Sequence, residues 1–212
     1  MKKSVMFLSS FVAFASFAQN TVKDLAAAKE IVWYGLNFTE AKMVGQFDQA
    51  MGAAPATAAE IKNKWIPAWN NLIIAEPQNF KLKEAFEKES VYYDMSPVEK
   101  ANQAIKADQL MMVNTFTFAD PQKTIKNAIS KLSGGEKKEG LGLTFVVESF
   151  NKTNDEAVVY AVVFDIKTKT ILVSEKMTGK PTGIGLRNFW AGAMKHIIKQ
   201  ITKDYYPKWK SR

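Results

Sequence analysis

Three mostly apolar stretches of the C-terminal half, residues 141–151, 157–166 and 170–178, are separated by short polar segments. Short apolar runs bounded by turn signals are typical of β-strands. The polar stretches 151–156 and 165–169 between them are short enough for tight turns. The middle stretch is apolar on both faces, which indicates a central strand with cover on each side. We therefore predict an antiparallel meander of three strands.

A helix is predicted from about residue 57 to residue 75. Thr57 and Glu60 have the spacing of a capping box, in which each side chain accepts a hydrogen bond from a free backbone N–H at the helix start. Apolar residues then recur with helical spacing. Pro67 should bend this helix because it lacks a backbone donor, and Pro77 should end it.

Capping signals mark two more helices. Ser96 and Glu99 form a second capping-box pattern, and Asp120 precedes a helix that runs towards Gly134. Composition and periodicity predict helices at residues 20–29, 80–88, 96–106, 121–132 and 186–205, and strands at 31–38, 91–95 and 110–118. Together these elements predict one α+β domain over residues 19–212, with a mixed, largely antiparallel sheet, a C-terminal three-strand meander and helices packed on its faces.

The first 18 residues have the three parts of a cleavable signal peptide. Lys2 and Lys3 form the basic end, residues 5–17 are mostly apolar, and Ala18 completes a small-x-small cleavage site. A membrane anchor is the alternative, but spanning takes about 20 apolar residues and this run is shorter. We expect cleavage between Ala18 and Gln19 and a periplasmic or secreted protein without a stable membrane anchor.

Composition narrows the chemistry of the mature chain. The sequence contains no cysteine, which excludes disulfides, thiolate catalysis, cysteine-ligated zinc and a lipid-modified N-terminal cysteine. Without Lys2 and Lys3, 27 basic residues stand against 21 acidic ones, a net charge of +6 rather than +8. Only two of the basic residues are arginines, which nucleic-acid readers favour, so we expect a solvated lysine surface and no nucleic-acid partner.

No catalytic residue, metal site or cofactor is predicted. His196 is the only histidine and lies on the lysine-bearing face of the last predicted helix, so we expect a surface role. Phosphate-binding loops, nucleophile elbows and calcium loops are absent from the sequence. A catalytic pair of carboxylates is not excluded by the sequence, because the two acidic residues of such a pair can come from distant positions in the chain. Glu148 and Glu175 lie inside predicted strands, at what we interpret as an exposed sheet margin.

The turn before the last predicted helix is a candidate anion site. Gly183 and Gly185 lie at a helix N-terminus, where free N–H groups and the helix dipole favour an anion, and Lys180 and Arg187 add positive charge. The alternative is that the glycines only let the chain turn from sheet to helix. The aromatic residues are a further possible ligand surface, although most of them fall on faces assigned to the core.

Two segments carry a resemblance to known sequences: residues 31–42, IVWYGLNFTEAK, and residues 185–192, GLRNFWAG. Both resemble secreted proteins of unknown function from Bacteroidetes. More loosely, the C-terminal hairpin followed by a helix is similar to the closing section of small envelope accessory domains. The resemblance implies an exported protein with a sheet backed by helices, and it brings no catalytic residue.

The leading interpretation is a non-enzymatic binding or interaction module of the cell envelope, with an unknown envelope protein or ligand as its partner. A carboxylate-based hydrolase acting on a glycan or ester is one alternative. Weak binding of an anionic envelope polymer or lipid head group through the lysine surface is another. A pocket that joins Glu148, Glu175 and residues 180–187 would favour the hydrolase, and a scatter of these groups would favour the binding module.

Overall fold

The computed structural model describes residues 22–49 and 54–211. The strands of this part of the chain form one sheet, and they are β1 (Glu30–Asn37), β2 (Lys42–Val44), β3 (Ser90–Tyr93), β4 (Met111–Met112), β5 (Leu141–Asn151), β6 (Glu156–Asp165) and β7 (Ile171–Gly179). β5 is central. One of its edges pairs first with β1 and further along with β2, and these two strands have β3 and β4 as their outer neighbours. β6 and then β7 follow on the other edge.

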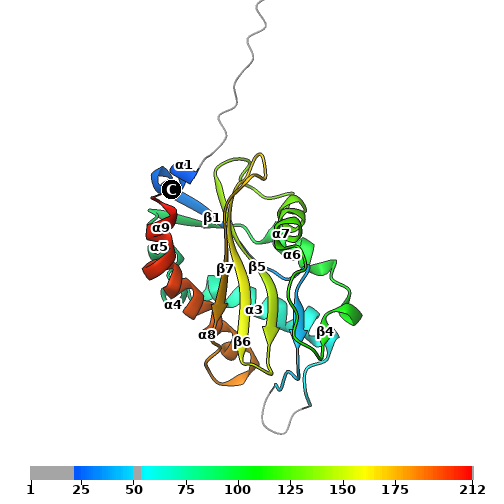
Figure 1. Cartoon of the computed structure of the whole chain (residues 1–212). Helices are drawn as coiled ribbons and strands as arrows, with labels where there is room; N and C mark the ends of the chain where they lie inside the picture. Colours follow the sequence, from blue (N-terminus) through cyan, green and yellow to red (C-terminus); the bar gives the residue numbers. More distant parts are fainter. Residues whose placement is uncertain (1–21, 50–53, 212) are drawn as a thin grey trace, which may run out of the picture.

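Four of the six strand pairings are parallel, and only β5–β6 and β6–β7 are antiparallel. The sheet curls into a half-barrel with helices around it, an α/β-type arrangement (Figure 1). The prediction of a largely antiparallel sheet is therefore wrong. The C-terminal meander is present, because short turns join its strands. Helical segments separate β2, β3, β4 and β5 from one another, and such crossovers bring the chain back in the parallel direction, while β1 continues into β2 along the same edge of β5 without a helix.

The helices of the described residues are α1 (Val22–Ala27), α2 (Ala58–Glu60), η1 (Ile61–Trp65), α3 (Ile66–Ala75), α4 (Pro77–Phe80), α5 (Leu82–Ala85), α6 (Ser96–Gln103), η2 (Ala107–Gln109), α7 (Pro121–Ser130), α8 (Gly185–Gln200), η3 (Ile201–Tyr205) and α9 (Tyr206–Trp209). The predicted capping box is confirmed: the Glu60 N–H donates to Thr57 Oγ1 at 3.2 Å, and the Thr57 N–H donates to the Glu60 carboxylate at 2.8 Å. The helix then runs to Ala75 with a π-helical stretch, η1, just before Pro67. The missing proline N–H explains why regular hydrogen bonding fails there.

Several local predictions are wrong. Ser96 does not cap α6, because its hydroxyl donates to Asp94 at 2.8 Å and the helix has no side-chain cap. The helix predicted at residues 80–88 is divided between α4 and α5 by Lys81, whose φ of 46° is left-handed. The strand predicted at residues 110–118 shrinks to the two residues of β4. The short strand β2 was not predicted at all.

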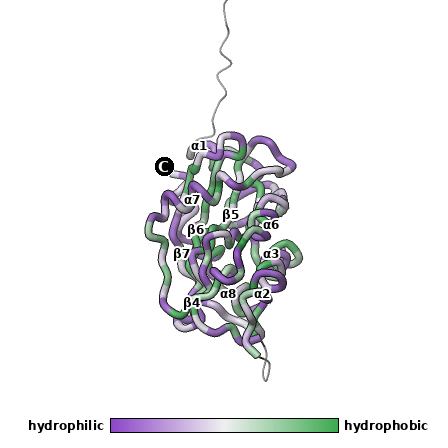
Figure 2. The backbone as a smooth tube through the Cα atoms, turned by 90° about the vertical axis from the view of Figure 1, so that its right-hand side faces the viewer, coloured by the Kyte–Doolittle hydropathy of each residue, from purple (hydrophilic) through white to green (hydrophobic). Residues whose placement is uncertain are grey.

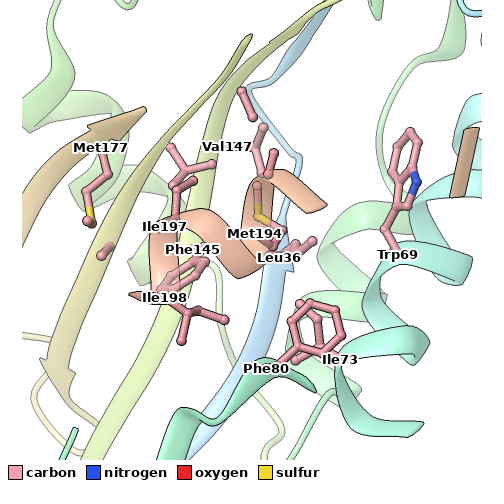
Figure 3. Packing of buried hydrophobic residues seen from close by; sticks show 14 of the residues in the cluster. Leu36, Trp69, Ile73, Phe80, Phe145, Val147, Met177, Met194, Ile197 and Ile198 are labelled. Carbon is pink, nitrogen blue, oxygen red and sulfur yellow. The ribbon is translucent and has the colours of Figure 1, made fainter. Parts of the chain in front are cut away.

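The sheet separates two hydrophobic cores of unequal size. The larger core lies between the sheet and helices α3 and α8, where Leu36, Phe145 and Val147 of the strands meet Trp69 and Met194 of the helices (Figure 3). The smaller core lies on the other face under α6 and α7. Hydrophobic residues follow the strands through the middle of the molecule and hydrophilic ones lie further out (Figure 2).

The N-terminal helix and the C-terminal helix meet at one end of the sheet (Figure 1). Buried Lys88 joins them, since its ammonium donates to the Leu25 carbonyl and also contacts the Tyr206 hydroxyl at 3.1 Å. Burial lowers the pKa of Lys88 and raises the pKa of Tyr206 to about 12. Trp209 is fully buried, so the chain at this end packs against the body of the domain. The predicted signal peptide lies outside the described residues.

Candidate functional site

The carboxylates singled out in the sequence do not come together. Glu148 is completely buried on the small-core face, where its Oε1 lies 2.8 Å from Lys176 Nζ. Glu175 precedes Lys176 in β7 and points to the other face, where it accepts a hydrogen bond from the Trp209 indole at 3.3 Å. The interpretation of Glu148 as an exposed margin residue is wrong, because its side chain is fully buried and accepts a hydrogen bond from the Phe118 N–H.

The predicted anion turn is only partly assembled. Gly183 and Arg187 line a hollow of about 430 Å³ beside α8, together with Glu76 and Lys195, whereas Lys180 and Gly185 do not line it. The Lys180 backbone N–H instead donates to His196 Nδ1 at 3.0 Å. His196 is exposed, as expected for a surface residue.

The two glycines of that turn both have left-handed backbone conformations, with φ of +126° at Gly183 and +78° at Gly185. A Cβ at Gly183 would lie 2.9 Å from the Asn188 carbonyl oxygen, so the chain also needs the missing side chain for close approach. These requirements of the turn account for both glycines without a ligand.

A larger groove lies where β1 gives way to β2, and we call it the junction groove. Its first part is a hollow of about 420 Å³ between residues 39–42, 105–110 and 116–120. Its second part is a hollow of about 400 Å³ between the end of α6 and the end of α7. The two hollows are neighbours, because they share four lining residues: Thr39, Ile105, Lys106 and Gln109.

The junction groove is positively charged. Four lysines line it against two carboxylates: Lys42, Lys100, Lys106 and Lys131 against Glu40 and Asp120. Lys131 pairs with Glu40 at 3.0 Å. Lys42 donates to the Gln109 carbonyl. Lys100 and Lys106 are exposed and have no ion-pair partner within residues 22–49 and 54–211.

The carboxylate of Asp120 is already engaged at the start of α7. It accepts a hydrogen bond from the Lys123 N–H at 3.0 Å, which confirms Asp120 as the helix cap. The N-terminal end of α7 borders the groove through Asp120 and Thr124 and adds the positive end of a helix dipole. The electrostatic character of the groove therefore favours an anion.

Two buried asparagines bind the backbone at the end of β1, where the sheet is interrupted before β2 begins. Asn70 of α3 accepts a hydrogen bond from the Leu36 N–H at 2.7 Å and donates to the Leu36 carbonyl at 3.2 Å. Asn102 of α6 accepts from the Phe38 N–H at 2.8 Å. These side-chain amides satisfy the backbone hydrogen-bonding groups of Leu36 and Phe38, which lie beyond the point where β3 ends. No further strand is therefore needed to pair with the chain there. The break between β1 and β2 is thereby stable, and residues 39–42 can line the groove.

One wall of the groove is an irregular segment, residues 113–119, which we call the strap. Phe118 stacks on Tyr160 with ring centroids 5.8 Å apart and an interplanar angle of 17°, and Phe116 packs edge-on against Phe118 at 5.8 Å. The Phe118 N–H donates to Glu148 Oε2 at 2.9 Å. Most of the strap belongs to the strand predicted at residues 110–118, a prediction that rested on composition.

The buried charge beneath the strap perturbs its neighbours. Contact with the Glu148 carboxylate raises the pKa of Lys176, and burial, assisted by the same carboxylate, raises the pKa of Tyr160. Lys176 is about half exposed, with 47% of its side chain accessible, so water reaches one member of the pair and not the other. Glu148 therefore depends on Lys176 for its counter-charge.

The groove residues were not recognisable as a site from the sequence. The groove lysines come from three distant stretches of the chain, at residues 42, 100–106 and 131, and look like ordinary surface lysines. Only the parallel crossovers bring them together, and that topology was predicted wrongly. Their one sequence signal is the lysine surplus itself.

Within the described residues, no group of three or more acidic residues or histidine is placed to hold a metal ion. None of the helices there has the length and apolar character needed to cross a membrane. No family model, curated protein or solved structure matches the chain.

Proposed function

We propose that the protein is an exported, non-enzymatic binding module that takes an anionic ligand of the cell envelope into the junction groove. The observation that supports this best is the pair of exposed lysines without an ion-pair partner, Lys100 and Lys106, on two adjoining hollows whose lining is positively charged. Charged groups lining a concave site concentrate ligands of opposite charge. The basic residues that line the groove are all lysines. A lysine ammonium recognises the negative charge of a ligand, whereas the planar guanidinium of arginine also recognises a fixed geometry.

The apolar residues of the groove support a ligand with hydrophobic parts as well as negative charge. Ala101, Ala104 and Ile105 line the part between α6 and α7, and Phe116 and Phe118 line the strap side. Binding sites commonly combine such apolar walls with a few polar groups that fix orientation. The hydrolase alternative gains no support, because Glu148 and Glu175 lie on opposite faces of the sheet.

Calorimetric titration of the chain from Gln19 with sodium polyglutamate tests the proposal, with uncharged dextran as the comparison. Binding of polyglutamate should weaken as salt rises, because screening acts on exposed charges. The double variant Lys100→Glu, Lys106→Glu should weaken binding by about tenfold or more. Lys199→Glu, Lys203→Glu changes the charge of the chain equally at exposed positions away from the groove and should have a much smaller effect.

Equal losses in the two double variants, or equal binding of dextran, would contradict the groove as an anion site. Polyglutamate recovered after long incubation should keep its original length, since the proposal includes no catalysis. Export is tested separately by sequencing the mature N-terminus. A start at Gln19 agrees with the proposal, and a start at Met1 contradicts it.

A further inference from the structure

We propose that Glu148 is a positioning residue for the junction groove: from beneath the strap, its buried carboxylate fixes the wall against which the ligand binds. This inference rests on the proposed function for its consequence in binding. Its structural part, the anchoring of the strap, stands on contacts of Glu148 that do not involve the groove.

Glu148 occupies an unusual place in the sheet. The β5–β6 ladder shifts register between Val147 and Ser149, so Glu148 is the extra residue of a β-bulge. On the opposite edge of β5, pairing with β1 ends at Val146 and pairing with β2 begins at Ser149. Glu148 thus lies in an interruption on both edges. Bulges re-aim a side chain, and here the side chain is a carboxylate directed at a loop.

The strap depends on this carboxylate. Of the backbone groups of residues 113–119, the Phe118 N–H is the only one that makes a hydrogen bond to any other described residue, and its acceptor is Glu148. Side chains add to this attachment: Phe118 stacks on Tyr160, and Phe116 packs against the small core with Lys42 Nζ 6.0 Å from its ring centroid. A segment with a single backbone anchor has few other restraints on its position, so loss of that anchor should let the wall move.

The anchor is built to be strong. The acceptor is a fully buried carboxylate that forms an ion pair, and hydrogen bonds to charged acceptors are stronger than those between neutral groups. Lys176 supplies the counter-charge at 2.8 Å, as an ion pair rather than a well-directed hydrogen bond. The Tyr160 hydroxyl lies 3.5 Å from the oxygen that accepts from Phe118. Residues of the sheet, Lys176 and Tyr160, therefore fix the carboxylate on one side, and the carboxylate binds the strap on its other side.

Two variants separate anchoring from charge. Glu148→Gln removes the ion pair but keeps an oxygen that can accept from the Phe118 N–H. Glu148→Leu removes the ion pair and the acceptor at similar volume. We expect Glu148→Leu to weaken polyglutamate binding by about tenfold and Glu148→Gln by about twofold or less, because only the leucine variant releases the wall. Similar affinities for the two variants would overturn the positioning role.

Amide hydrogen exchange tests the anchor without any ligand, and its first comparison needs only the wild-type chain. In the wild-type chain, the Phe118 amide should exchange far more slowly than those of Thr117 and Ala119. In Glu148→Gln this protection should persist, and in Glu148→Leu it should disappear. A Phe118 amide that exchanges as fast as its neighbours in the wild type contradicts the inference. If polyglutamate does not bind at all, the proposed function fails, while the exchange result still decides the anchor.

Discussion

The two faces of the sheet are built differently. On the face covered by α3 and α8, neighbouring rings pack without charge: Trp190 stacks on Phe150 with centroids 4.4 Å apart and planes 8° apart, and Phe47 stacks on Trp190 at 5.5 Å. The face covered by α6 and α7 contains the buried Glu148, the strap and the junction groove. The comparison suggests that one face supplies most of the stability and the other is arranged for binding.

The largest effect is expected from the aromatic face. Trp190→Ala should destabilise the fold by about 4 kcal/mol, because it removes a fully buried ring and leaves a cavity. Phe189→Ala is the matched control, since Phe189 is the adjacent residue and is only partly buried. Urea unfolding measures both. A loss for Trp190→Ala no greater than that for Phe189→Ala would break the comparison of the two faces.

The second effect concerns the buried ion pair. Lys176→Met should cost about 3 kcal/mol, because it leaves a fully buried carboxylate without its counter-charge. Glu148→Gln should cost about 1 kcal/mol, since the lysine left behind is half exposed and can be solvated. Urea midpoints of the two variants give the order directly. The reverse order would mean that the carboxylate does not need Lys176.

A smaller effect is expected from Tyr34 of the small core. Burial and then the charge of Asp94 raise its pKa to about 12, from an ordinary value of 10.0. Between these values the unfolded chain loses the phenolic proton before the folded chain does. The stability that Tyr34 contributes is therefore present below pH 10 and is lost as the pH rises towards 12.

Tyr34→Phe removes this titration and tests its sign. The urea midpoint of the wild type should fall relative to that of Tyr34→Phe as the pH is raised from 9 to 12. Measurement at pH 8 gives the reference difference between the two proteins. A difference that stays constant over this range would show that the phenol does not contribute in the expected way.

Local sequence signals correctly predicted the features that depend only on residues close together in the chain. The capping pair Thr57 and Glu60, the cap at Asp120 and the meander strands lie close to their expected positions, because each is fixed within a few residues. The parallel pairing of β1 with β5 joins residues more than 100 positions apart, and no local pattern encodes it. The strap shows the opposite failure, since its composition is typical of a strand although no neighbour pairs with it.

The candidate site was harder to predict than the fold. Glu148 was noticed as an acid inside a strand, but its burial arises from a bulge and from the strap, which the sequence does not reveal. The glycine turn at residues 180–187 was predicted as a ligand site from its helix N-terminus, whereas the more basic groove is assembled from lysines of three separate segments, at residues 42, 100–106 and 131. Topology, rather than any motif, defines this groove.

The central claim is that an anion binds on the small-core face, in the junction groove. Chemical-shift mapping of the ¹⁵N-labelled chain from Gln19 during titration with polyglutamate tests it most directly. If an anion binds in the junction groove, shifts should be concentrated at residues 39–42, 100–109 and 116–120, with the amides of α3 and α8 unchanged. Shifts concentrated around residues 180–187, or on the face covered by α3 and α8, would contradict it, as would the absence of any shift at low salt.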